Sequence, residues 1–119
     1  MFKIDPNHAF WWKIEFKWPK DDGSGHADKS FKAQFRRMNA DEFLERTKTV
    51  MAADENDTDA ITAIREIMRA VFLDFKDIEF DGDDRDAVKD WLLGDTAIIR
   101  SMYQGYNVAI LGREITEGN

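Results

Sequence analysis

The stretch with the clearest pattern for chemistry is residues 77–84, DIEFDGDD, where acidic and apolar residues alternate before a glycine in sixth place. The first half of an EF-hand calcium loop has this pattern, because oxygens at positions 1, 3 and 5 surround the cation and glycine makes the turn. Position 12 of such a loop is a bidentate glutamate, whereas here it is Val88. We therefore interpret the stretch as a solvated acidic turn between two helices, and we expect no metal site.

Other catalytic groups are few and widely spaced. The chain has no cysteine, and its two histidines, His8 and His26, lack partners at the spacing of a metal site or a catalytic triad. The glycine-containing residues 23–25 lack the lysine and the strand-to-helix context of a phosphate-binding loop. We therefore expect a protein that is not an enzyme and that needs no cofactor.

Aromatic residues are the unusual part of the composition, with 4 Trp, 9 Phe and 2 Tyr among 119 residues. Core packing is the ordinary explanation for aromatic residues, and we expect the core to contain Trp12, Phe16, Phe35, Phe72 and Trp91. Core packing does not explain Trp11, because strand alternation puts this residue on the same side as Lys13 and Glu15. Exposed Trp and Tyr side chains are typical of protein interfaces. The candidate partner-binding residues are Trp11, Trp12, Trp18, Tyr103 and Tyr106.

Length and charge narrow the classes of protein. A chain of 119 residues with 43% hydrophobic residues is expected to form one compact domain over residues 1–112, followed by a polar tail at 113–119. The net charge of −7 repels phosphate backbones and anionic lipids, so neither nucleic acid nor a membrane is expected as a partner. The chain has no basic leader with an apolar run and no membrane-length apolar segment, so we expect a cytoplasmic protein.

Alternation predicts two strands near the start of the chain. In residues 10–18, FWWKIEFKW, every second residue from Phe10 to Trp18 is apolar, so one aromatic face is expected to be buried. A second alternating run covers residues 30–38 after a long polar loop, and the two runs are expected to pair antiparallel. Residues 2–4 are a candidate for a short third strand.

Spacings of three and four between apolar residues predict helices in the rest of the chain. The first begins after Asn39 as its cap, with Glu42 in the place of a capping box, and ends near residues 50–52. The second begins at Thr58 or Asp59, after a polar connector at residues 54–59. It continues through the apolar residues Ile61, Ile64, Met68, Val71, Phe72 and Phe75.

Two more helices follow the acidic turn. Residues 84–93 form the third, with Ala87, Val88, Trp91 and Leu92 expected on its buried side. The last begins after Asp95 or Thr96 as its cap and ends at Gly112. The predicted fold class is therefore α+β, with an N-terminal antiparallel β-hairpin at about residues 10–38 packed against three to four C-terminal helices.

Four motifs occur in a familiar order: the strand FKAQFRRM, the helix start NADEFLE, the segment VFLDFKDIEFDGDD and the closing helices AVKDWLLGDTAIIRSMYQGYNVAILGR. Over residues 10–113 this order resembles the tail assembly chaperones of long-tailed bacteriophages, which have a similar strand pair and a similar acidic, glycine-containing turn. The chain departs from the family at Phe75, where tryptophan is frequent, and it lacks a proline–phenylalanine pair after the turn.

The resemblance implies a non-enzymatic chaperone that binds the phage tape measure protein and keeps its long hydrophobic helices soluble. It also implies that the chaperone helps to recruit the major tail protein during assembly of the tail tube. The protein would act in the cytoplasm of the bacterial host and be absent from the mature virion. Self-association of the chain is left open.

Two other interpretations compete with this one. An acidic mimic of DNA would occupy a phosphate-binding cleft through the carboxylates of residues 54–59 and 77–86. A calcium-dependent module would show a rise in melting temperature with calcium that a chelator reverses. A chaperone that grips apolar helices would be largely insensitive to both charge reversal at these carboxylates and calcium.

Overall fold

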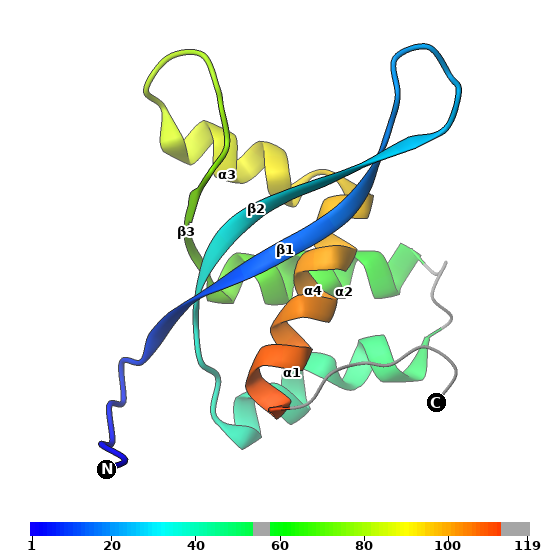
Figure 1. Ribbon diagram of the computed structural model, residues 1–119. Helices are drawn as coiled ribbons and strands as arrows, with labels where there is room; N and C mark the ends of the chain where they lie inside the picture. Colours follow the sequence, from blue (N-terminus) through cyan, green and yellow to red (C-terminus); the bar gives the residue numbers. More distant parts are fainter. Residues whose placement is uncertain (54–57, 113–119) are drawn as a thin grey trace.

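The computed structural model describes residues 1–53 and 58–112 (Figure 1). Most of the connector expected at residues 54–59, and the whole tail expected at 113–119, lie outside the described residues. The expected α+β fold is confirmed, since a small antiparallel sheet is followed by helices that pack against it.

The sheet has three strands in the order β1 (Ala9–Pro19), β2 (His26–Arg36) and β3 (Phe72–Lys76). β1 and β2 form the expected hairpin, paired antiparallel along their whole length. The loop between them is shorter than the sequence pattern indicated, because β2 begins at His26 and leaves only residues 20–25 unpaired. The third strand is not at residues 2–4, which adopt no strand structure.

The strand β3 occupies residues that were expected to belong to the second helix, which was predicted to continue to Phe75. This prediction is wrong. Helix α2 (Thr58–Val71) ends earlier, and the chain passes directly into the strand. Phe72 is paired with Phe35 and Phe75 with Ala33, so β3 has one residue more than β2 between the two pairs. Because of this bulge, both phenylalanines are buried although they are three residues apart. A spacing of three is also typical of a helix, which explains the wrong prediction.

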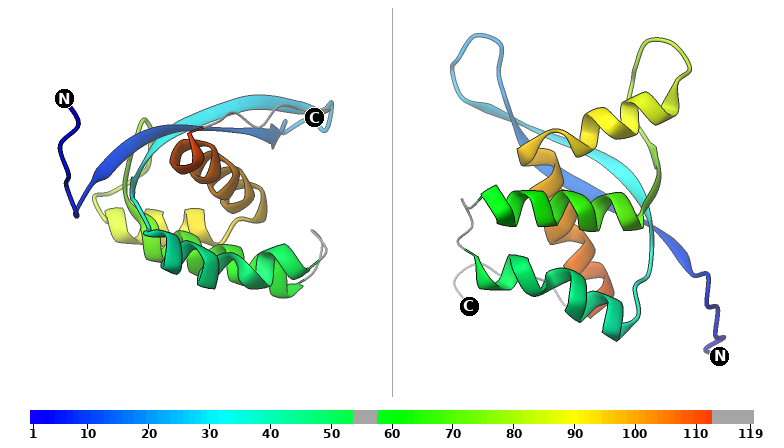
Figure 2. Two further views of the ribbon diagram at one scale, coloured as in Figure 1. Left: turned by 90° about the horizontal axis from the view of Figure 1, so that it is seen from below. Right: turned by 180° about the vertical axis from the view of Figure 1, so that it is seen from behind.

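Four helices lie on one face of the sheet, and the last of them lies between the sheet and the first two (Figure 2). They are α1 (Ala40–Ala52), α2, α3 (Arg85–Leu93) and α4 (Thr96–Leu111). Three begin with a side chain that accepts a hydrogen bond from the backbone N–H three residues later, the capping residues being Asn39, Asp84 and Asp95. The expected caps at Asn39 and Asp95 are thereby confirmed, as is the end of α4 at Gly112, which has a φ of 66°.

The side chain of Glu42 binds two arginines, whereas the sequence predicted that it would complete a capping box. Its two carboxylate oxygens accept hydrogen bonds of 2.9 and 2.8 Å from the guanidinium of Arg36 in β2, and a third from Arg46. The Arg36 Nε also donates to the carbonyl oxygen of Ala70 in α2. The bond to Arg36 lowers the pKa of Glu42 from 4.5 to about 2. This cluster ties β2 to the start of α1 and the end of α2.

The core lies between the sheet and α4, where Tyr106 is completely buried. Its hydroxyl donates to the carbonyl oxygen of Arg36 at 2.9 Å and accepts from the N–H of Met38 at 3.0 Å. α4 approaches β1 closely at Gly105, where a Cβ atom would lie 3.0 Å from Ile14 Cδ1. The small residue therefore allows the helix to pass directly against the strand.

Candidate functional site

The five candidate partner-binding residues do not form one surface. Trp11 is 37% exposed on the sheet face that no helix covers, and the Nζ of Lys76 lies 4.2 Å from the centre of its ring. Trp12 is 38% exposed although it lies on the face toward α4, so the expectation that it is a core residue is wrong. Trp18 is half-buried near the far end of the hairpin.

The two candidate tyrosines lie in α4 and are less accessible. Tyr103 is half-buried against the core, and burial raises the pKa of its hydroxyl. Tyr106 has no exposed surface, and burial raises the pKa of its hydroxyl as well. In this structure Tyr106 therefore supports the fold and offers no atom to a partner.

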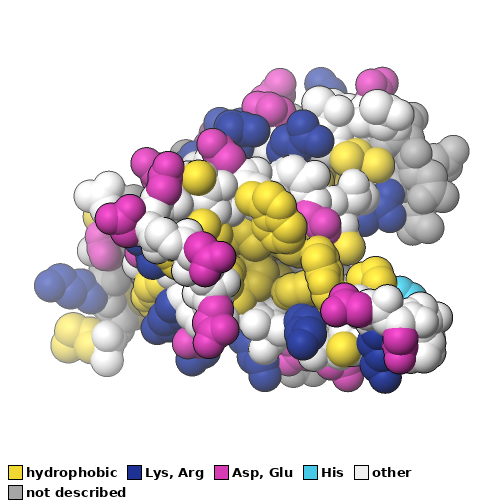
Figure 3. Space-filling model, turned by 90° about the horizontal axis from the view of Figure 1, so that it is seen from above, with side chains coloured by type: hydrophobic (Ala, Val, Ile, Leu, Met, Phe, Trp, Pro, Cys, Tyr) yellow, Lys and Arg dark blue, Asp and Glu magenta, His cyan; other side chains and the backbone are white. Residues whose placement is uncertain are grey.

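An apolar cleft of about 420 Å³ opens between the end of the hairpin, α3 and the loop that precedes α3. Figure 3 looks down on this end of the molecule and shows hydrophobic side chains exposed in a hollow between two charged walls. We call it the aromatic cleft and define it by its main apolar lining residues, which are Phe16, Trp18, Phe31, Ile78, Trp91 and Leu92.

Two tryptophans from distant parts of the chain meet in the aromatic cleft. The rings of Trp18 in β1 and Trp91 in α3 have centroids 6.2 Å apart, and Phe16 lies 5.8 Å from Trp18 on the same strand. Trp91 is 59% exposed, so its assignment to the core is corrected. Ala87, also expected to be buried, is exposed, whereas Phe35 and Phe72 lie in the core as expected.

The sequence contained a signal for the position of Trp91. Leu92 and Leu93 are both buried, and two adjacent buried residues fix the inward direction of a short helix. With 100° per residue, Trp91 then lies about 150° from the direction midway between these two leucines. It therefore remains largely exposed while Leu92 and Leu93 anchor its helix.

The loop of residues 77–84 forms one wall of the aromatic cleft. Ile78 and Phe80 pack against the core while Asp77 and Glu79 face solvent, so the inward and outward alternation expected from the sequence is confirmed. Asp77 has a φ of 67°, and this left-handed residue turns the chain out of β3. The acidic residues therefore belong to an ordered wall whose apolar side faces inward.

Arg85 closes the base of this loop. Its guanidinium donates to Asp74 Oδ1 at 2.7 Å and to the carbonyl oxygen of Phe75, and it lies 4.1 Å from the centre of the Phe75 ring. The bond to Arg85 lowers the pKa of Asp74. These contacts hold the first turn of α3 against β3 and so fix the distance between the two ends of the wall.

The rim of the aromatic cleft is polar and carries charges of both signs. Asp77 and Glu79 lie along the loop wall, while Lys29 and Ser30 lie along β2 on the opposite side. A ligand that fits this arrangement has an apolar stripe for the floor and charged side chains along its margins. An amphipathic helix and an extended peptide with alternating residues both meet that description.

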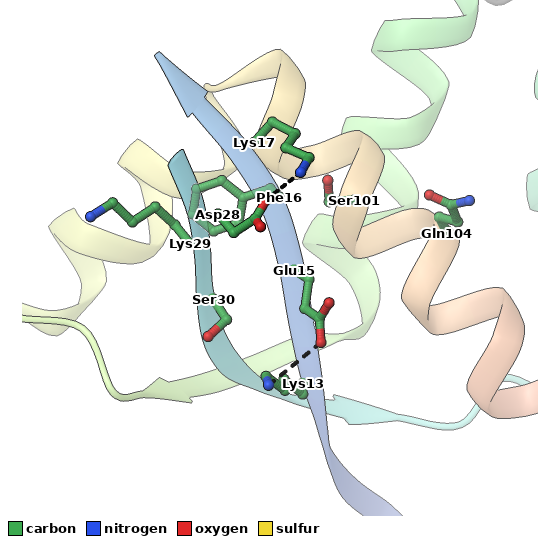
Figure 4. Close-up of a pocket in the computed structure, with 9 residues that line it drawn as sticks. All are labelled: Lys13, Glu15, Phe16, Lys17, Asp28, Lys29, Ser30, Ser101 and Gln104. Atoms are coloured by element: carbon green, nitrogen blue, oxygen red, sulfur yellow. Dashed lines mark hydrogen bonds and ion pairs between the residues drawn. The ribbon is translucent and has the colours of Figure 1, made fainter. Parts of the chain in front are cut away.

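A second hollow lies beside the edge of β1 and is polar (Figure 4). Lys13, Glu15 and Lys17 reach it from β1, and Ser101 and Gln104 reach it from α4. Two ion pairs lie in it, Lys13 with Glu15 at 3.5 Å and Lys17 with Asp28. Neither histidine nor cysteine contributes to its lining.

The two histidines lie in separate parts of the fold. His8 lies beside Phe10, with ring centroids 5.8 Å apart, and His26 is the first residue of β2. Among the described residues, no three His, Cys, Asp or Glu side chains are placed to hold a metal ion. The aromatic cleft therefore remains the most distinctive surface for function.

The comparisons with known proteins leave this geometry to be interpreted on its own. No family model, no curated protein and no solved structure matches the chain. Within the described part of the chain, none of the helices combines the length and the apolar character that crossing a bilayer requires.

Proposed function

We propose that this chain is a non-enzymatic binding protein that holds an apolar segment of another protein in the aromatic cleft. The observation that carries the proposal is the pair Trp18 and Trp91, whose rings are brought together by separate elements. Trp91 is exposed and Trp18 is half-buried, so both rings keep some surface accessible to solvent. Tryptophan is enriched among residues that dominate binding energy, because its large rigid ring buries much apolar area. A groove of this kind accepts the apolar face of an amphipathic helix.

Within this class, we propose the tail assembly chaperone that the sequence motifs resemble. The client would be the tape measure protein, whose long hydrophobic helices need cover before assembly, and recruitment of the major tail protein would follow. Two features support this proposal: an apolar cleft suited to helices, and a net charge of −7 that keeps a loaded chaperone from aggregating. The host cytoplasm, as the place of action, belongs to the same proposal.

The test is co-expression with a client. The gene that encodes this chain is expressed together with the longest neighbouring reading frame rich in coiled-coil heptads, and the soluble fraction of that client is measured with and without the chain. The proposal predicts that the client is soluble only in the presence of the chain and co-purifies with it. A client that is equally insoluble in both cases would overturn the proposal.

Two tryptophan variants locate the binding surface. Trp91→Ser removes an exposed ring from the aromatic cleft, and Trp11→Ser removes an exposed ring from the uncovered face of the sheet. We expect Trp91→Ser to reduce client recovery about tenfold or more, as expected for a central binding residue, and Trp11→Ser to change it little. Equal losses from both variants would argue against the aromatic cleft as the binding surface.

An acidic mimic of DNA is the alternative, and the exposed carboxylates of the loop before α3 support it. Reversal of three charges, Asp81→Lys, Asp83→Lys and Asp84→Lys, separates the two functions. A mimic would lose its binding to a DNA-binding partner, because that binding depends on the carboxylates. A chaperone would retain its client, since the apolar floor of the aromatic cleft is unchanged.

A further inference from the structure

The N-terminal arm, residues 1–8, carries large apolar side chains that are exposed in the described part of the chain. Phe2 is 89% exposed and Ile4 is 80% exposed, with Lys3 between them. A turn closed by the His8 N–H and the Asp5 carbonyl oxygen at 3.1 Å joins the arm to β1. The arm therefore leaves the fold in a defined direction and presents two large apolar side chains to solvent.

The arm and the aromatic cleft lie at opposite ends of the hairpin. The arm joins β1 at Ala9, whereas the cleft begins at Phe16 and Trp18, and Figure 1 shows the N-terminus far from the hairpin loop. The strand from Ala9 to Phe16, at the near margin of the cleft, spans roughly 23 Å, and to Trp18 it spans roughly 30 Å. The arm from Phe2 to Ala9 reaches at most about 24 Å when fully extended, and the turn between Asp5 and His8 shortens that reach. An arm folded back along its own strand therefore does not reach Trp18.

The arm and the aromatic cleft match in apolar pattern and in charge. In an extended arm Phe2 and Ile4 lie on one side, as a ligand for an apolar floor requires. Lys3 can reach the carboxylates of Asp77 and Glu79 on the loop wall, since a lysine stem extends along apolar surface. Asp5 lies on the same side of an extended arm as Lys3, and its charge is opposite to that of Lys29 on the β2 rim.

We propose that the arm of one copy of this chain binds in the aromatic cleft of a second copy. Such a contact joins two different surfaces, so it is heterologous and can repeat head to tail into a ring or an open chain. The inference concerns self-association and does not depend on the function proposed above. Its consequence for any client is competition, because an arm seated against Trp18 and Trp91 occupies the apolar surface that another segment would need.

The first test measures mass as a function of concentration. Sedimentation velocity from about 10 µM to about 1 mM covers the range in which a short peptide contact of this kind saturates. We expect the average mass to rise above the monomer value of 13.9 kDa with concentration for the unchanged chain. An unchanged chain that stays monomeric over the whole range would overturn the proposal.

The decisive test mixes two defective variants. Phe2→Ser with Ile4→Ser leaves the aromatic cleft intact but removes the apolar part of the arm, and Trp91→Ser does the opposite. Each variant alone is expected to stay monomeric, whereas their mixture is expected to form a 1:1 dimer and no larger species. A mixture that stays monomeric, or variants that associate alone as the unchanged chain does, would contradict a head-to-tail contact.

Charge exchange tests the orientation of the arm. Lys3→Glu and Glu79→Lys are each expected to weaken self-association at least threefold, and the chain with both changes is expected to recover most of it. Lys48→Glu, an exposed change on α1, is the matched control and is expected to have no effect. Equal weakening by the control, or a further loss in the double variant, would rule out the proposed pairing.

The arm variant also separates this inference from the proposed function. With Phe2→Ser and Ile4→Ser, self-association is expected to be lost while a client is still kept soluble, because the aromatic cleft itself is unchanged. Loss of client recovery without any change in self-association would count against the arm as a ligand of the aromatic cleft.

Discussion

The molecule contains two aromatic clusters that differ in how they are closed. In the first, the Phe35 ring lies 5.1 Å from Tyr106 and 6.1 Å from Phe72, and all three residues are buried. In the second, Trp18 and Trp91 lie 6.2 Å apart and remain accessible to solvent. Both clusters join strands of the hairpin to helices, so proximity of rings alone does not distinguish a core from a binding surface.

The difference lies in what completes each cluster. In the closed cluster a hydroxyl satisfies two backbone groups next to Arg36, whose guanidinium is in turn held by Glu42. The open cluster has an apolar floor and a charged rim but no element above it. Closed clusters contribute stability through burial and satisfied hydrogen bonds, whereas open ones keep their apolar area for a partner.

The largest expected effect is the removal of the tyrosine ring from the closed cluster. Tyr106→Ala should lower the free energy of unfolding by about 3–5 kcal/mol, because a large buried ring leaves a cavity. Tyr106→Phe should cost about 1–2 kcal/mol, since the N–H of Met38 and the carbonyl of Arg36 lose their shared partner. Urea denaturation measures both values, and a loss below about 1 kcal/mol for the alanine variant would break the contrast between the clusters.

The next effect concerns the ionic contact that supports the closed cluster. Glu42→Gln should lower the free energy of unfolding by about 1–2 kcal/mol at pH 7, because a charge-assisted pair with Arg36 becomes neutral. Since the pKa of Glu42 in the folded chain, about 2, lies below its ordinary value of 4.5, its contribution to stability is complete above pH 4.5 and is lost as the pH falls toward 2.

Denaturation at several pH values checks the sign of this effect. The difference between the unchanged chain and Glu42→Gln should shrink steadily as the pH falls from about 4.5 to about 2. A difference that stays constant over this window would show that the carboxylate acts by packing and not by charge.

A smaller loss of stability is expected when Arg85, at the base of the loop of residues 77–84, is replaced. Arg85→Ala should lower the free energy of unfolding by about 1 kcal/mol, because the charged pair with Asp74 is partly solvated. Hydrogen exchange should become faster at the N–H groups of residues 77–84, since the base of the loop loses its clamp. Unchanged exchange there would show that Ile78 and Phe80 alone hold the wall.

The smallest effect on stability is expected in the open cluster itself. Trp91→Ser should change the free energy of unfolding by less than about 1 kcal/mol, because most of the ring is already in contact with water. Thermal denaturation of this variant beside Tyr106→Ala measures the contrast directly. A large loss for Trp91→Ser would mean that the cleft is part of the core and not a surface kept for a partner.

Local signals in the sequence were sufficient for most of the fold. Alternation over residues 10–18 predicted β1, and the side chains of Asn39 and Asp95 predicted two helix starts within one residue. These elements depend on short-range physics, namely the two-residue period of a strand and the hydrogen bond of an N-cap. Of the five candidate binding residues, only Trp18 was placed in the aromatic cleft.

The cleft itself depends on tertiary structure and was not predictable in the same way. It forms because the end of the hairpin and the end of α3 come together across more than seventy residues, which places the ring of Trp91 beside that of Trp18. Helical periodicity predicted that Trp91 is an apolar residue of an amphipathic helix. It does not predict which other element of the fold a residue of that helix contacts. The prediction for Tyr106 is wrong in the opposite direction. Its hydroxyl suggested a residue at the surface, whereas the hydroxyl is buried and donates to the carbonyl oxygen of Arg36.

The bulge in β3 has a consequence for the order in which the chain folds. Phe72 and Phe75 have the spacing of a helix, and they directly follow α2, so short-range preferences alone would lengthen that helix by another turn. Only the backbone of β2, already paired with β1, gives residues 72–76 a reason to extend. The hairpin is thus the template that decides where α2 stops, and we expect the third strand to dock after the hairpin has formed.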